Sequence, residues 1–318
     1  MTAARRREVV GGLLGTAAAA TVIPPATAAP IYGLAPREVV PGLWLFEGRR
    51  EHFSPANGGN ILNTAVLDTG GDGLIAFDTG PSRLYGQEMR RAVEALGAGP
   101  VRLVVISHGH PDHYLGSQAF DGVPVASLPG ARAMIEALGG AFSDNMYRLI
   151  DRWMAGTETV VPDQELAAGS FGFGRRGLEI LALSGHTAAD LALFDHDTRT
   201  LVAGDLVFFD RAPTTPQADI PAWHASLDRL AALRPARVVP GHGPVSEGTA
   251  AIDQTRRYLD WLVATLEDAA RRGLDMAEAM RLPVAPEFAP MAVLPGEFVR
   301  SVSHLYPAIE LQVLERAN

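Results

Sequence analysis

The chain contains no cysteine among its 318 residues. This absence excludes disulfide bonds, cysteine-ligated zinc, a thiol nucleophile and the lipid-attachment cysteine of a bacterial lipoprotein. It also means that cysteine usage gives no indication of the redox compartment in which the protein works. The chemistry of the protein must therefore rely on other side chains.

The chain is also short of positive charge. It has 27 Lys and Arg against 36 Asp and Glu, and its formal net charge is −9. Nucleic-acid phosphates are bound by basic side chains that replace counterions, so this balance disfavours a nucleic-acid partner. No Lys/Arg-rich run marks a membrane-surface segment. We therefore expect a small-molecule substrate as the main partner.

The size and composition are those of a soluble globular protein. Hydrophobic residues make up 47% of the chain and charged residues 20%, which is enough apolar material for a sizeable core. A length of 318 residues suits one large domain, or a domain with an extension.

The first 28 residues have the three parts of a secretory signal. Arg5-Arg6-Arg7 precede an apolar stretch, Val9 to Ile23, and Ala26-Thr27-Ala28 follow as a small-residue cleavage pattern. The adjacent arginines resemble a twin-arginine signal, although Val9 stands where that motif prefers Phe. The apolar stretch is too short for a transmembrane helix. We therefore expect export to the periplasm, with no stable membrane insertion after the signal is removed.

Short β-like runs alternate with helical patterns along the rest of the chain. Because hairpins also occur, the expected fold class is α/β (α+β), with two mixed β-sheets packed face to face and helices on both outer faces. The β-like runs are residues 61–67, 74–79, 101–106, 123–127, three runs between 178 and 209, and 237–240. Helical patterns cover 81–97, 131–153, 220–230, 252–273 and 298–314.

A cluster of histidines follows the apolar run 101–106. His108, His110 and His113 occur within six residues, together with Asp112. Neutral imidazoles at this density present several nitrogen donors to one partner, and a divalent metal ion is the partner that fits. Pro111 excludes a helix interior, so we expect the cluster on a loop. In an extended loop, His108 and His110 point the same way and can reach one ion.

Three further candidate ligands follow later β-like runs. His186, Asp205 and His242 each stand beside a glycine, where the backbone must come close. Two ions about 3.5–4 Å apart need more ligands than the first cluster supplies. If the strands end at one edge, all seven side chains converge there.

These motifs resemble those of the metallo-β-lactamase superfamily. The resemblance rests on residues 107–113 (SHGHPDH), Gly185-His186-Thr187, Gly204-Asp205 and Gly241-His242-Gly243, in this order, with residues 77–80 (FDTG) upstream. It covers roughly residues 36–272 and implies an αββα sandwich. The domains expected are the export signal at 1–28, a metallo-β-lactamase-fold domain at 29–272, and a helical extension at 273–318 packed on that domain.

The resemblance also implies a role for each ligand. One metal ion would take His108, His110 and His186, the other Asp112, His113 and His242, and Asp205 would bridge them. The implied reaction is hydrolysis by a hydroxide held between two Zn²⁺ ions, with Asp112 as the catalytic residue that positions it. True β-lactamases carry Cys or Ser at the position of Asp205. This difference favours ester, thioester, lactone or amide substrates over antibiotics.

A narrower resemblance points to one branch of the superfamily. Residues 203–214 (AGDLVFFDRAPT), Trp223 and residues 239–244 (VPGHGP) look like the periplasmic quinoprotein relay system zinc metallohydrolases. This likeness implies a link to a quinoprotein dehydrogenase system.

Three other functions stay open. The same ligand frame holds a single iron ion in sulfur dioxygenases, although His113 and Asp205 complete a second site here. RNA-processing nucleases share the HxHxDH motif, but the acidic chain disfavours their substrate. The chain could also be a non-enzymatic, metal-dependent accessory factor of a quinoprotein.

A few further residues are candidates for substrate contacts. Residues 57–60 (NGGN), with His52, could form a flap over the metals or an ordinary turn, and Tyr114 or Arg211 could orient a substrate. We expect specificity to reside in loops 48–60 and 209–220. His196, His224 and His304 fit surface or packing positions. The prolines at 283, 286 and 290 suit a C-terminal segment that covers the site or docks elsewhere on the surface.

Overall fold

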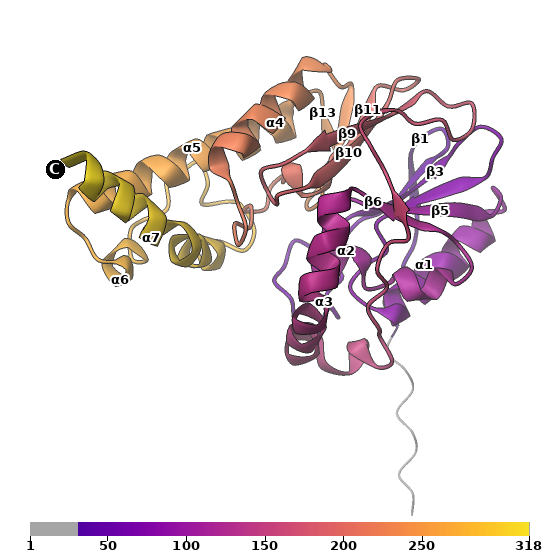
Figure 1. Cartoon of the computed structure of the whole chain (residues 1–318), viewed down its shortest axis with the longest axis horizontal. Coiled ribbons are helices and arrows are strands. Elements are labelled where there is room, and N and C mark those ends of the chain that lie inside the picture. Colours follow the sequence, from indigo (N-terminus) through magenta and orange to yellow (C-terminus); the bar gives the residue numbers. More distant parts are fainter. Residues whose placement is uncertain (1–30, 318) are drawn as a thin grey trace, which may run out of the picture.

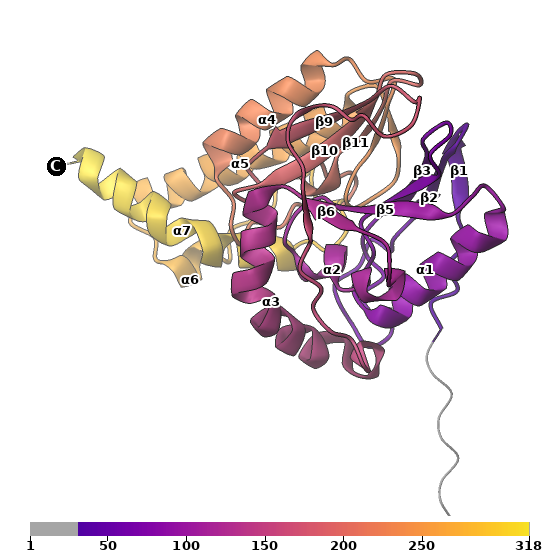
Figure 2. The same ribbon diagram turned by 45° about the vertical axis from the view of Figure 1, so that its right-hand side comes forward.

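A computed structural model describes residues 31–317 of the chain. The predicted export signal at residues 1–28 lies outside the described residues. Two β-sheets pack face to face and helices cover their outer sides (Figures 1 and 2). This arrangement confirms the predicted αββα sandwich of two mixed sheets.

The first sheet contains seven strands in sequence order. Strands β1 to β4 are antiparallel neighbours, whereas β4 to β7 run parallel to one another. Their bounds are β1 Arg37–Val40, β2 Leu43–Phe46, β3 Thr64–Asp68, β4 Leu74–Phe77, β5 Val101–Ile106, β6 Val125–Ser127 and β7 Gln164–Glu165.

The second sheet contains six strands in the order β13-β12-β11-β10-β9-β8. Only β11 and β12 are parallel neighbours in it. The bounds are β8 Gly169–Ser170, β9 Leu178–Leu183, β10 Asp190–Asp195, β11 Thr200–Val202, β12 Arg237–Val239 and β13 Ser246–Glu247.

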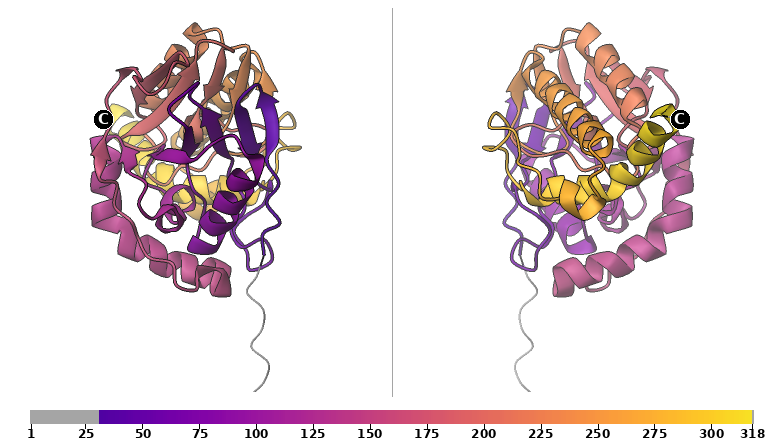
Figure 3. Two further views of the ribbon diagram at one scale, coloured as in Figure 1. Left: turned by 90° about the vertical axis from the view of Figure 1, so that its right-hand side faces the viewer. Right: turned by 90° about the vertical axis from the view of Figure 1, so that its left-hand side faces the viewer.

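The helices lie outside the two sheets. Figure 3 shows α4 and α5 side by side on the outer face of the second sheet, and these two helices are in contact. The helix bounds are α1 Arg83–Leu96, α2 Pro111–Tyr114, α3 Pro129–Ile150, α4 Ile220–Ala232, α5 Ala250–Arg271, α6 Met276–Ala279 and α7 Gly296–Ala317.

Alternating side chains of the strands form three apolar layers. In β5, Leu103 and Val105 face the space between the sheets, whereas Val104 and Ile106 face α1 and α3. Successive side chains of a strand point to opposite faces of the sheet. Neighbouring residues of one strand therefore belong to different layers. The sandwich therefore has one core between the sheets and one beneath each helical layer.

Two local predictions are corrected by the structure. Pro81 lies before helix α1 rather than inside it, because Ser82 is the N-cap and its side chain accepts a hydrogen bond from the backbone N–H of Tyr85. Pro111 does not place the whole histidine cluster on a loop, because it occupies the first turn of the short helix α2. Proline is tolerated there because the first helical N–H groups have no partner inside the helix. Asp112 and His113 therefore lie on one helical turn.

The C-terminal segment packs on the second helical layer. Helix α7 contacts α5, and Phe298, Val302 and Tyr306 join the apolar cluster that contains Tyr258 and Leu262. Figure 1 shows α7 and the end of α5 extending beyond the second sheet. Within residues 31–317, no helix is long and apolar enough to cross a membrane. The boundary at residue 272 stays a prediction.

Candidate metal centre

The predicted ligands lie on segments that directly follow strands of both sheets, with Asp112 and His113 on helix α2. His108, His110, Asp112 and His113 come after β5 of the first sheet; His186, Asp205 and His242 come after β9, β11 and β12 of the second. The short turn Gly204–Leu206 carries Asp205. All seven side chains are buried, with exposed fractions of 8% or less. The structure thus brings together every residue that the sequence motifs selected.

The ligand atoms form two groups. In the first, nitrogen or oxygen atoms of His108, His110, His186 and Asp205 lie within 4.8 Å of one another. The Nε2 atoms of His108 and His186 each lie 2.9 Å from Nδ1 of His110. Three imidazole nitrogens therefore face one point.

The second group contains Asp112, His113 and His242, again within 4.8 Å of one another. Asp205 contacts both groups: its Oδ2 lies 3.4 Å from Nε2 of His186, and its Oδ1 lies 3.3 Å from Nε2 of His113. Oδ2 is also 3.3 Å from Nε2 of His242. Asp205 occupies the position expected of a bridging ligand, and the bridging role itself stays a prediction.

The outer nitrogens of four histidines make hydrogen bonds that fix the rings. Nδ1 of His242 donates to the carbonyl of Ile61 at 2.7 Å, and Nε2 of His110 donates to Oε1 of Gln217 at 2.7 Å. The other two outer contacts are His108 Nδ1 to Ser107 Oγ at 3.0 Å and His113 Nδ1 to Asp78 Oδ2 at 2.8 Å. A neutral ring that donates its proton in such a bond presents the lone pair of the opposite nitrogen to the centre.

Asp78 is the supporting residue whose role the sequence did not reveal. Its carboxylate is fully buried and accepts from Ser107 N and Ser107 Oγ at 2.8 Å each, in addition to His113. Asp78 has a φ of +57°, a conformation that Asp and Asn adopt more readily than most residues. The motif of residues 77–80 contained this residue, but only the fold shows that it holds both Ser107 and His113.

Burial keeps His108, His110 and His186 neutral, whereas burial of His113 is outweighed by Asp205, Asp112 and Asp78, which raise its pKa well above the usual value. Burial, together with the neighbouring histidines, lowers the pKa of His108 and His186 well below the usual range. Burial would raise the pKa of Asp205, but His242 and His113 outweigh that effect and hold its pKa well below the usual value. A neutral imidazole and an ionised carboxylate are the forms that bind a metal ion.

The donor set fits divalent metal ions. Nε2 of His113 and Oδ1 of Asp205 are buried and lie 3.3 Å apart, but neither makes a hydrogen bond among residues 31–317. Unpaired buried polar atoms are costly, and a metal ion would satisfy both. Five histidines and two carboxylates match the nitrogen and oxygen ligands of zinc, and imidazole and carboxylate also bind iron.

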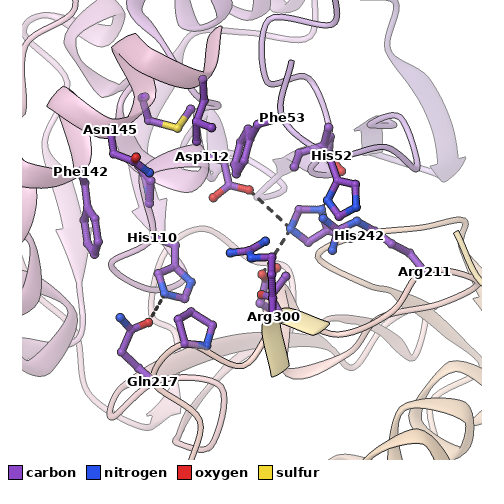
Figure 4. Close-up of a pocket in the computed structure, with 17 residues that line it drawn as sticks. His52, Phe53, His110, Asp112, Phe142, Asn145, Arg211, Gln217, His242 and Arg300 are labelled. Carbon is purple, nitrogen blue, oxygen red and sulfur yellow. Dashed lines mark hydrogen bonds and ion pairs between the residues drawn. The ribbon is translucent and has the colours of Figure 1, made fainter. Parts of the chain in front are cut away.

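A cavity of about 460 Å³ opens beside the ligands. Figure 4 shows His110, Asp112 and His242 at its inner wall, with Phe142 and Gln217 to one side and His52 and Arg211 to the other. Arg300 of α7 also lines it. Arg211 was a sequence candidate and Gln217 lies in the predicted specificity loop 209–220. No sequence signal marked Arg300.

The remaining candidates lie elsewhere. Tyr114 is fully buried and does not line this cavity. Asn57 is held in a turn by hydrogen bonds to His52 O and Glu51 Oε2, so residues 57–60 form an ordinary turn, and only the preceding His52 and Phe53 reach the cavity. His196 and His224 pair with Glu179 and Asp260 outside the cavity.

Comparison with known proteins places this geometry in a family. The sequence model described as "Metallo-beta-lactamase superfamily" matches residues 57–242. A linear primary-alkylsulfatase of Pseudomonas sp. (strain ATCC 19151) is 23% identical over 280 residues, or 73% of this chain and 52% of the relative. A beta-lactamase-like protein 2 homolog of Caenorhabditis elegans is 26% identical over 199 residues, or 62% of this chain and 60% of the relative. The chain thus spans little more than half the length of either relative.

Solved structures share the fold. A metallo-beta-lactamase from Pontibacter korlensis superposes with a TM-score of 0.59 at 21% identity, covering 71% of this chain and 99% of the other. The metallo-beta-lactamase FIM-1 from Pseudomonas aeruginosa, in its mono-zinc form, has a TM-score of 0.59 at 17% identity, covering 74% of this chain and 98% of the other. At these identities the likeness concerns the fold alone.

Proposed function

Because the chain belongs to the metallo-β-lactamase superfamily, we propose that it is a hydrolase that uses two metal ions, which we take to be zinc, to cleave a small ester, thioester, lactone or amide. The observation that supports two ions is the position of Asp205. Its carboxylate lies within 3.4 Å of nitrogens from both ligand groups. One ion alone would leave the second group of buried donors unpaired.

His108, His110 and His186 would hold one ion, and Asp112, His113 and His242 the other, with Asp205 between them. When bound, such ions would act as Lewis acids that activate a water molecule and polarise the scissile carbonyl group. Asp112 lines the cavity, so its carboxylate can accept a hydrogen bond from the attacking water and orient it. Asp112 is therefore our candidate catalytic residue.

Other cavity residues would bind the substrate and exclude water. Gln217 uses its oxygen to accept from His110, which leaves its –NH2 group as a donor to a substrate oxygen. Phe53, Phe142 and Leu149 form an apolar part of the wall. Exclusion of water by such side chains strengthens the electrostatic interactions inside the site.

The metal content of the mature protein, residues 29–318, tests the proposal. Elemental analysis after native purification should find about two zinc ions per chain, as in two-metal hydrolases. One iron ion per chain, with oxygen consumption, would instead favour a sulfur dioxygenase-like enzyme. No bound metal would favour a non-enzymatic accessory factor.

Ligand variants separate metal binding from folding. Asp205→Ala and His110→Ala should each lose metal and hydrolytic rate together, whereas His196→Ala, an exposed histidine at a hairpin tip, should change neither. Full activity in Asp205→Ala would contradict the ligand assignment.

We also propose that the protein works in the periplasm and serves a quinoprotein dehydrogenase system. Support comes from the sequence features of residues 1–28 and from the motif likeness described above. Replacing Arg6 and Arg7 by Lys should block export, which cell fractionation measures.

Deletion of the gene should impair a quinoprotein dehydrogenase, and a copy with Asp205→Ala should not restore it. Restoration would favour a binding role without catalysis.

A sulfate ester is a second candidate substrate. One relative is named a linear primary-alkylsulfatase and is 23% identical. In a sulfate ester, the anionic sulfate group is itself the group released by hydrolysis. Sulfate release from a linear alkyl sulfate, followed by ion chromatography, would identify this activity, and the absence of release would exclude it.

A further inference from the structure

The cavity beside the ligand groups has two chemically different sides. Phe142, Asn145 and Gln217 are uncharged and lie on one side of His110 in Figure 4. His52 and Arg211 lie on the opposite side, next to His242, and Arg300 reaches in from α7. Positive charge is therefore concentrated on one wall of the cavity.

Arg211 is a buried cation with few partners. Its exposed fraction is 2%, and its Nε has no hydrogen-bond partner among residues 31–317. One NH group donates to the carbonyl of Ala212 at 3.3 Å, and the guanidinium carbon lies 5.8 Å from the Phe208 ring centroid. Arginine stays charged in proteins. A buried charge that makes no direct ion pair is costly, so Arg211 favours an anion in the cavity.

Arg300 is held toward the same wall by Glu297. Its NH1 donates to Oε1 of Glu297 at 2.5 Å, and that carboxylate is fully buried. The same oxygen lies 3.5 Å from Nδ1 of His52. The side chain of Arg300 is 48% exposed, so its remaining N–H groups are available to a ligand.

The charges on this wall do not balance. Arg211 and Arg300 carry two positive charges, and Glu297 supplies one negative charge. Glu297 forms its ion pair with Arg300, and Arg211 has no ion pair within 4.0 Å among residues 31–317. The two carboxylates that line the cavity, Asp112 and Asp205, belong to the metal-ligand groups. One positive charge therefore remains for a ligand.

We propose that the substrate carries an oxyanion group, such as a carboxylate, that is distinct from the bond being cleaved and that binds to Arg211 and Arg300. The inference rests on the proposed hydrolytic function and names the substrate class for it. A planar guanidinium forms two parallel hydrogen bonds with a carboxylate. The uncharged remainder of the substrate lies toward Phe142 and Gln217, and the scissile bond lies between, beside Asp112.

Arg300 is then a specificity-determining residue supplied by the C-terminal segment. It lies outside residues 57–242, which match the family. Helix α7 is positioned by its apolar contact with α5, so the docking of a segment outside the family match completes the substrate site.

Matched substrates test this proposal. 4-Acetoxybenzoate and 4-acetoxybenzamide differ only by a carboxylate in the leaving group; phenyl 4-carboxybenzoate and phenyl 4-carbamoylbenzoate differ likewise in the acyl group. In at least one pair, kcat/KM of the purified metal-loaded protein should be about tenfold or more higher for the carboxylate, the size expected for a charged hydrogen bond. Equal or higher rates for both carboxamides would overturn the proposal.

Variants assign the preference to residues. Arg300→Gln should reduce kcat/KM for the carboxylate about tenfold, mainly through KM, and leave the carboxamide within about twofold. Arg132→Gln, which removes a surface arginine from an i,i+4 pair with Glu136, is the matched control and should change neither. Arg211→Lys keeps the charge but loses the planar donor pair, so it should weaken carboxylate selectivity while unfolding remains cooperative. An equal loss for both substrates in Arg300→Gln would contradict the assignment.

A binding measurement separates this inference from hydrolysis. If none of the four esters is cleaved, the hydrolytic proposal fails for esters, and calorimetry with 4-carbamoylbenzoate still tests the anion site. Binding that weakens about tenfold in Arg300→Gln supports it. Equal binding by wild type and Arg300→Gln, as expected for an anion held on the metal ions alone, would overturn it.

Discussion

Nδ1 of His113 lies 2.8 Å from Oδ2 of Asp78, and both side chains are fully buried. This hydrogen bond turns Nε2 of His113 toward Asp205, at 3.3 Å. Asp78, which is not among the candidate metal ligands, thus orients one of them from the turn that follows β4.

The first prediction concerns this contact. Asp78→Asn keeps the size of the side chain and tolerates the positive φ, but it removes the charge behind His113. We expect metal affinity to fall about 10- to 100-fold, as for other changes to residues that support ligands. Metal retention against a competing chelator measures this. Asp195→Asn, another buried aspartate, should retain metal as the wild type does; loss of metal in both variants would indicate a general folding defect instead.

Gly241 lies against the carboxylate of Asp205. A Cβ at position 241 would stand 2.0 Å from Oδ1 of Asp205, so Gly241→Ala must displace either the carboxylate or the backbone. We expect loss of metal and activity together, measured by elemental analysis and ester hydrolysis. Gly140→Ala is the control, because a Cβ there meets nothing within 4 Å and the residue lies in α3. It should raise the free energy of unfolding by about 1 kcal/mol. Normal metal content in Gly241→Ala would disprove the argument.

Trp223 joins two of the ligand loops. Its Nε1 donates to the carbonyl of Leu206 at 2.9 Å, and its ring meets His186 edge-on at 5.2 Å between centroids. Trp223→Phe leaves that carbonyl unpaired, so we expect a loss of about 1–3 kcal/mol in the free energy of unfolding and a lower metal occupancy. Urea titration and elemental analysis measure both. Trp44→Phe, at a half-buried position of β2, should cost less and leave the metal content unchanged.

The ion pair between Arg176 and Asp195 predicts a pH dependence of stability. Burial would raise the pKa of Asp195, but hydrogen bonds from Arg176, at 2.7 Å, and Thr198 outweigh it and lower the pKa. A carboxyl group with a lowered folded pKa stabilises the protein above its unfolded pKa, which is about 3.9. That contribution is lost as the pH falls through the lower folded pKa.

Asp195→Asn should therefore lower the free energy of unfolding at pH 7 by about 3 kcal/mol, because Arg176, whose side chain is only 9% exposed, loses its partner. The difference from wild type should shrink as the pH is lowered through the acid range. Urea titrations at a series of pH values measure this. A difference that does not change with pH would show that the charge of Asp195 is not responsible.

Much of the fold and the ligand set could be predicted from local patterns. His108, His110 and Asp112 stand close in the sequence, and His186, Asp205 and His242 follow β-like runs, so the spacing itself indicates convergence. The structure places all seven in two adjoining groups. Local patterns suffice here because the ends of neighbouring strands meet at one edge of a sandwich.

Other contacts depend on tertiary packing and left no signal in the sequence. Arg300 stands in a segment whose sequence pattern predicts only a helix, and its position in the cavity follows from how α7 docks on α5. The hydrogen bond from His110 to Gln217 joins residues 107 positions apart. The loop predicted from Pro111 for Asp112 and His113 is wrong, because proline breaks helix interiors but suits first turns.

Because the candidate ligands come from both sheets, metal binding would affect the stability of the folded sandwich. His108 and His110 come from the first sheet, and His186 and Asp205 from the second, so an ion in that group would cross-link the two halves of the sandwich at one edge. An ion that binds only the folded chain adds about 2.7 kcal/mol to its stability at a free concentration 100 times its dissociation constant. A shortage of metal in its surroundings would then lower the stability of the folded chain as well as its activity.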